Sequence, residues 1–167
     1  MNPEGSGTAR TEVLAELHRL REDLADVDGS VVATTDGMVI AHDLGSSETY
    51  GVQPEGVAAL AAVSLGLSQR IADTANHGEL RDLVIRGTLG QVVTFAAGER
   101  ALLTVIMSSS GDLAPLRPHA ERVVRRLIEL LDDNWQDDAA TWTGGPGLVQ
   151  DPNRRVPGAF RNPPAGL

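Results

Sequence analysis

The sequence predicts an α+β domain in which helices cover both faces of one five-stranded antiparallel sheet. Three stretches carry helical periodicity, and five short runs of β-branched and aliphatic residues lie among them. The connections between consecutive strand-like runs are too short for a parallel crossover. The expected order is helix, two strands, helix, three strands, helix, and helices that flank antiparallel strands in this way are typical of the α+β class.

Length and composition favour one domain inside the cell. The 167 residues include no cysteine, which excludes disulfides and thiolate metal sites. The net charge is -9 and the 14 basic residues are arginines scattered among carboxylates, which argues against a nucleic-acid or anionic-lipid surface. No apolar run reaches the roughly 20 residues of a spanning helix, and no signal-like stretch opens the chain. We expect a cytoplasmic protein, with any membrane recruitment supplied by its partners.

The first helix is expected from residue 8 or 11 to Ala25, because apolar residues recur there on one face. Asp36-Gly37 separates two strands at 30–35 and 38–43 and predicts a hairpin with a type I′ turn, since Asp and Gly tolerate positive φ. The apolar face of the helix is Val13, Leu17, Leu20 and Leu24. Three further strands, expected at 80–86, 89–96 and 100–107, form a meander.

The last helix is expected to begin between Asp112 and Pro118 and to end near Asp132. Its core stripe is Ala120, Val123, Val124, Leu127, Leu130 and Leu131. On its solvent side, Arg125 stands four residues from both Glu121 and Glu129, which is ion-pair spacing.

Both ends of the chain are expected to be disordered, over residues 1–8 and 133–167, leaving a domain at 9–132. The final segment is rich in Gly, Pro, Asp and Asn and carries too little apolar area to order itself. A short partner-binding motif around Trp135 or Trp142 is the alternative interpretation.

The middle helix, expected at 55–76, has two faces that both lack charge over the first turns. We expect the side with large apolar residues to pack on the sheet: Val57, Leu60, Val63, Leu67 and Ile71. The other side holds Ala58, Ala59, Ala62, Gly66, Gln69, Arg70 and Asp73, with Leu65 at its edge. Small residues let a second helix approach closely, so this side is predicted to pair with its copy across a two-fold axis. The alternative is that alanine is simply a good helix former.

No pattern in the sequence supplies catalytic or metal-binding equipment. The four histidines lie on different elements at His18, His42, His77 and His119, so metal-pair spacing is absent. The loop Ser108–Gly111 lacks the Gly-x-Ser-x-Gly pattern of hydrolases, although a cryptic hydrolase using Ser109 or Ser110 is a third alternative. Weak cation binding by Asp28, Asp36 and Asp43 is conceivable, but turn chemistry explains the first two. We expect no enzyme, cofactor or metal.

Several local patterns resemble the roadblock/dynein light chain family. They are the run Val27–Ala41, the alanine-rich helix from Gly56 to Asp73, the three-strand run and the opening Leu113–Arg117. The resemblance covers residues 9–132 and implies a roadblock-like, profilin-like sandwich. Pro115 and Pro118 depart from the family's freely helical opening of the last helix.

The resemblance implies a non-enzymatic homodimer that regulates or scaffolds a small Ras-like GTPase in bacterial signal transduction, in some members by accelerating GTP hydrolysis. A sensor-kinase-like protein is a further implied partner. The dimer would form through the middle helix and the third strand, at Ala58, Ala59, Ala62, Leu65, Gly66, Gln69, Leu80, Asp82 and Val84. The GTPase would contact Gln69, Arg70 and Asp73. The alternative is a small-ligand sensor domain of a signalling complex, for which an aromatic content of 3% supplies few pocket-lining groups.

Overall fold

The computed structural model describes residues 3–45 and 51–141, and it confirms the predicted α+β fold and element order. The elements are α1 (Pro3–Asp23), β1 (Val27–Thr34), β2 (Val39–Asp43), α2 (Pro54–Thr74), β3 (Asp82–Arg86), β4 (Gly90–Ala97), β5 (Ala101–Ser108) and α3 (Leu113–Thr141).

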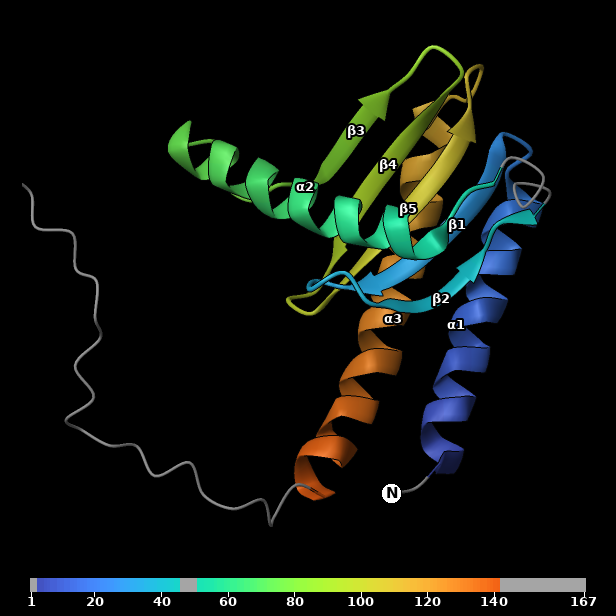
Figure 1. The fold of residues 1–167 in the computed structure, drawn as a ribbon, viewed down its shortest axis with the longest axis vertical. Coiled ribbons are helices and arrows are strands. Elements are labelled where there is room, and N and C mark those ends of the chain that lie inside the picture. The colour runs from blue at the N-terminus through green and yellow to red at the C-terminus, as the bar shows by residue number, and fades with distance from the viewer. Residues whose placement is uncertain (1–2, 46–50, 142–167) are drawn as a thin grey trace, which may run out of the picture.

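The five strands form one antiparallel sheet in the order β2-β1-β5-β4-β3. The last strand, β5, is central because it pairs with both β1 and β4, whereas β2 and β3 form the two edges. Figure 1 shows α2 lying across one face of the sheet, with α1 and α3 side by side on the other. The molecule therefore has three layers.

Each face of the sheet has its own apolar core. Under α1 and α3 the core includes the fully buried Val13, Leu17 and Leu20, which confirms the face predicted for the first helix. The stripe predicted for the last helix also packs into this core. The core under α2 is smaller and is built largely from valine, alanine and leucine. Residues that alternate along a strand point to opposite faces, so one sheet serves both cores.

The turn between β1 and β2 is a hairpin turn, but it is not of type I′. Gly37 has a φ of +89°, whereas Asp36 does not adopt a positive φ. The N–H of Gly37 donates to the carbonyl of Thr34 at 2.9 Å, and the N–H of Thr34 donates to the carbonyl of Met38 at 2.9 Å. The hydroxyl of Thr34 also bonds to the Asp36 carboxylate. A turn followed by one left-handed glycine is the bulged form of a three-residue hairpin loop, and it needs positive φ at one position only.

Two helices are longer than the sequence predicted. The first begins at Pro3, inside the segment expected to be disordered, since proline is tolerated in the first turn of a helix. The last runs to Thr141, nine residues past the expected end at Asp132. No glycine or proline occurs between Pro118 and Gly144, so nothing in that stretch terminates a helix. The rest of the predicted tail, 142–167, lies outside the described residues.

The two prolines near the start of α3 leave the helix intact. The carboxylate of Asp112 caps the helix by accepting from the N–H of Ala114 at 2.9 Å. Pro115 stands in the first turn, where an N–H has no partner within the helix. Pro118 lies inside the helix and removes one backbone hydrogen bond.

Candidate interaction surface

Of the five large apolar residues of α2 predicted to pack on the sheet, Val57 is half-buried against the core under α2, but the other four point into solvent. Leu60, Val63, Leu67 and Ile71 are 71%, 70%, 59% and 62% exposed. We call these four residues the α2 stripe. The small-residue side faces the sheet instead, with Ala58 fully buried and Leu65 only 8% exposed. No other part of residues 3–45 and 51–141 therefore covers the stripe.

Close packing explains why the small side faces inward. Ala58 and Ala61 contribute to the core under α2, where they meet strand residues such as Val31 and Leu102. A Cβ added at Gly37 would lie 2.9 Å from the Cα of Ala59, so the β1–β2 turn touches the backbone of the helix. Small side chains at these positions let α2 lie close to the sheet. The small size of these side chains was also the reason for predicting that a second helix packs against this side of α2.

Gln69 anchors the end of α2 to the chain that enters β3. Its Oε1 accepts from the N–H of Leu80 at 2.8 Å, and its Nε2 donates to Asp73 at 2.7 Å. The helix ends at Thr74, and Asn76, two residues later, adopts a left-handed conformation at a φ of 56°. The side-chain amide of Gln69 is therefore hydrogen-bonded within the chain, and it positions the end of α2 on this surface.

The strand next to the end of α2 is an open edge of the sheet. Among the strands of the described residues, β3 has a neighbour on one side only, β4. Figure 1 shows the C-terminal end of α2 extending past this edge. An edge strand presents unpaired backbone N–H and C=O groups that can pair with another chain. An apolar helix that overhangs such an edge forms one continuous surface with it.

The residues predicted at a dimer interface are spread over three environments. Ala58 and Leu65 lie in the core, Ala62, Gln69 and Leu80 are half-buried against the sheet, and Ala59 and Gly66 are exposed on the flank of α2. Asp82 is half-buried and lies 3.2 Å from the guanidinium of Arg117 on α3. Val84 packs on the core under α1 and α3. Of the predicted GTPase contacts, Arg70 and Asp73 are exposed.

Sequence reasoning did not place the α2 stripe on the surface. The spacing identified the four residues as one face, but the outer side of a helix is normally recognised by its charges. In α2 the charged residues are few and stand at the two ends, at Glu55, Arg70 and Asp73. The available signal was the small size of the opposite side, which is what a tightly packed inner face requires.

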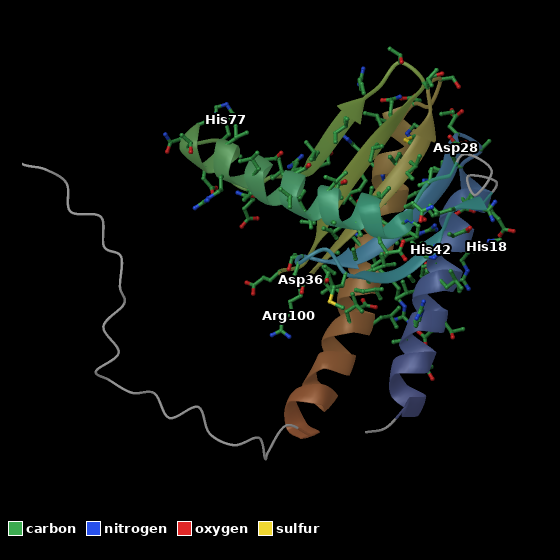
Figure 2. The ribbon with its side chains drawn as sticks, viewed as in Figure 1. His18, Asp28, Asp36, His42, His77 and Arg100 are labelled. Atoms are coloured by element: carbon green, nitrogen blue, oxygen red, sulfur yellow. The ribbon has the colours of Figure 1, made fainter. Side chains whose placement is uncertain are left out.

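The polar residues that could carry chemistry lie apart from one another. Figure 2 shows His77 at the end of α2, far from His18 and His42, and places Asp28 and Asp36 at opposite ends of β1. Within the described part of the chain, no three His, Cys, Asp or Glu side chains gather as they would around a metal ion. Across the described ranges, no helix is long and apolar enough to cross a membrane.

The loop Ser108–Gly111 is tied to the connection between α1 and β1. The N–H of Ser108 donates to the carbonyl of Asp26 at 3.0 Å, and its hydroxyl donates to the Asp26 carboxylate at 3.3 Å. Among the described residues, no histidine hydrogen-bonds to a hydroxyl of this loop, as a base that activates a serine would.

Among the described residues, the carboxyl group with a shifted pKa belongs to Asp43, at the end of β2. Burial raises its pKa, but hydrogen bonds from Arg21 at 2.9 Å and His18 at 3.2 Å outweigh burial and hold the pKa below its usual value of 3.8. The N–H of Gly45 donates to the same carboxylate at 3.3 Å. This cluster fastens α1 to β2 and lies away from the α2 stripe.

Cavities open on the surface of the described part of the chain beside α2 and beside α3. One, of about 190 Å³, lies beside α2 under Gly66 and Leu80, and the other, of about 230 Å³, lies beside α3. Small-molecule sites usually enclose about 300–1,000 Å³. Both cavities are smaller than this range, which does not favour the function of a small-ligand sensor.

Comparisons with known proteins agree with this fold. Myxococcus xanthus MglB is similar with a TM-score of 0.66 and 18% sequence identity, covering 74% of this chain and 90% of that one. A Roadblock/LC7 domain from Streptomyces avermitilis gives 0.63 and 18%, covering 71% and 96%. Acanthamoeba castellanii profilin IB gives 0.50 and 12%, covering 70% and 96%. At these identities the likenesses show the fold alone.

The family is shown by the sequence itself. No curated protein matches the chain. The model of the Roadblock/LC7 domain, however, matches residues 13–107, from the first buried valine of α1 to the end of β5. Because this match covers more than half of the 167 residues, the chain belongs to the Roadblock/LC7 domain family.

Proposed function

We propose that this protein is a non-enzymatic homodimer that regulates or scaffolds a small Ras-like GTPase in a signalling system. The α2 stripe, four large apolar side chains exposed beside an open sheet edge, carries the proposal. Soluble proteins rarely leave a contiguous apolar patch uncovered unless another protein binds it. Family membership supports the choice of partner, because members that resemble this chain act on Ras-like GTPases.

The dimer forms through β3 and the overhanging end of α2. Pairing β3 with β3 of a second copy satisfies the unpaired backbone groups of both edges and joins the two sheets. The two α2 helices then lie on the same side of the joined sheet. Leu67 and Ile71, on the last turns of α2, contact the second copy. In this dimer Leu67 and Ile71 make the contacts that the sequence had assigned to Ala58 and Leu65, because those two side chains are buried in the core under α2.

The GTPase binds the outer side of the paired helices. Leu60 and Val63 stand on the earlier turns of α2 and remain uncovered in this dimer. Arg70 and Asp73 supply exposed charges next to them. The protein acts by contacting the mobile switch segments of the GTPase and favouring one of their conformations, without donating a catalytic group.

Single-turnover GTP hydrolysis and nucleotide exchange by the cognate GTPase test this proposal. We expect the protein to change at least one of these rates and to form a complex in sedimentation. Leu60→Glu should abolish both effects and leave the dimer intact. Leu14→Glu, a matched change of an exposed leucine on α1 at the opposite face, should leave both effects in place. Unchanged hydrolysis and exchange, with no complex, would exclude GTPase regulation.

A further inference from the structure

The cleft of about 230 Å³ lies on the far side of the molecule from the α2 stripe, between α3 and the start of β3. Its floor is apolar and its rim is charged. The lining residues are Arg81, Phe95, Ala96, Glu121, Val124 and Arg125. Phe95 is buried in the core and Val124 is half-buried, so the floor is part of the rigid interior.

Arg125 differs from its neighbours on α3 in having no carboxylate partner among the residues whose side chains the structure describes. Each of the other three arginines of the described part of the helix has one. Their ion pairs are Arg117–Asp82 at 3.2 Å, Arg122–Asp23 at 3.0 Å and Arg126–Glu12 at 3.0 Å. The pairs expected from spacing, with Glu121 and Glu129, do not form, and Glu129 bonds to Arg126 instead.

Arg81, on the opposite rim of the cleft, shares this feature of Arg125. Among the described residues, neither Arg81 nor Arg125 forms an ion pair, although the protein carries a net charge of -9. Glu121, exposed in the same rim, pairs with neither of them. Two unneutralised guanidinium groups beside an apolar floor are complementary to carboxylates that flank an apolar side chain.

We propose that this cleft binds an acidic peptide segment of a protein partner. An apolar side chain of the segment packs on Phe95 and Val124, and neighbouring carboxylates bond to Arg81 and Arg125. Glu121 weakens the site by repulsion and so limits the negative charge that it accepts. A peptide fits better than a free small molecule, because the cleft is below the usual size of ligand sites and both arginines are exposed. The cleft is separate from the proposed GTPase surface, whereas Arg81 directly precedes β3, the strand proposed to pair with a second copy.

Titration of the 15N-labelled protein with the capped peptide Ac-Gly-Glu-Phe-Glu-Gly-NH2, followed by amide chemical shifts, tests the proposal. We expect saturable shifts at the cleft residues and weaker binding as salt is raised. Arg81→Gln and Arg125→Gln should each weaken binding about two- to fivefold, as loss of an exposed charge pair does. Glu121→Gln should strengthen binding, which a merely structural role for this residue would not produce.

The controls test separately whether binding depends on the peptide's carboxylates, on its apolar side chain and on its being a peptide. The peptide with both glutamates changed to glutamine, and the peptide with phenylalanine changed to alanine, should bind more weakly. Arg10→Gln, a matched change on the exposed side of α1, should have no effect. Equal binding of the glutamine peptide, absence of saturable shifts, or shifts at the α2 stripe would overturn the proposal. N-acetylphenylalanine binding as tightly as the peptide would assign the cleft to small carboxylates instead. Sedimentation of each variant shows separately whether the dimer persists.

Discussion

The side-chain oxygen of Gln69 accepts a hydrogen bond of 2.8 Å from the backbone N–H of Leu80, eleven residues further along the chain. This bond holds the last turns of α2 against the segment that leads into β3. The same side chain donates to Asp73 at 2.7 Å. Gln69 thus joins the two elements that we propose for the dimer, the overhanging helix end and the edge strand.

Gln69→Leu is expected to destabilise the protein by about 1–2 kcal/mol, because it removes the bonds to Leu80 and Asp73 and a longer one to Gly78. It also leaves the half-buried N–H of Leu80 unsatisfied. Urea unfolding measures the change. Gln53→Leu provides a matched control, since Gln53 precedes α2 and makes no capping bond through its side chain. Equal effects at the two positions would show that the bond to Leu80 does not hold the helix end.

Leu67→Glu is expected to yield a folded monomer. The side chain is 59% exposed in the single chain, so the charge is tolerated there but opposes burial against a second copy. Sedimentation velocity measures the oligomeric state, and far-UV circular dichroism checks the fold. Leu60→Glu, on an earlier turn of the same stripe, should remain dimeric. A dimeric Leu67→Glu protein would remove the end of α2 from the interface.

Gly66→Ala is expected to stabilise the protein by about 0.5–1 kcal/mol, since alanine is the better helix former and no atom beyond the adjoining residues and backbone of α2 lies within 4 Å of the added Cβ. Gly37→Ala should do the opposite, by about 1–2 kcal/mol, because its φ is +89° and its Cβ would meet the backbone of Ala59. Thermal unfolding compares the two variants. Loss of stability in Gly66→Ala that depends on protein concentration would mean that a second copy packs against this flank.

Asp43→Asn is expected to lower stability by about 1–2 kcal/mol at neutral pH. Burial acts to raise the pKa of Asp43, but Arg21 and His18 lower it below 3.8, so the ionised form stabilises the folded state. That contribution is complete above the ordinary pKa and is lost as the pH falls through the lowered one. The difference between the two proteins should therefore shrink below about pH 4. Urea unfolding across pH measures it, with the exposed Glu99→Gln as control; a gap that persists in acid would contradict this role.

The faces of α1 and α3 could be predicted because only one side of each helix is apolar. Leu17 and Leu127 are fully buried, whereas residues such as Arg19 and Arg126 on the other sides are exposed. Burying the charged side would leave ions without solvent, so periodicity alone determines the orientation. Over most of the length of α2, neither side carries charged side chains whose burial would be penalised. Periodicity then divides the helix into two faces but does not say which one meets the sheet.

The sequence by itself determined the α+β class, the order of elements and the antiparallel strands, because each depends on local spacing, turn residues and short connections. It also determined the family, through apolar and glycine patterns spread over most of the chain. Tertiary structure alone decided that Ala58 faces the sheet and Leu60 faces solvent, since the outcome depends on how closely the helix can approach the strands. It also brought Arg81 and Arg125 to one cleft, because Arg81 precedes the strand that pairs with β4, and α3 packs on β4.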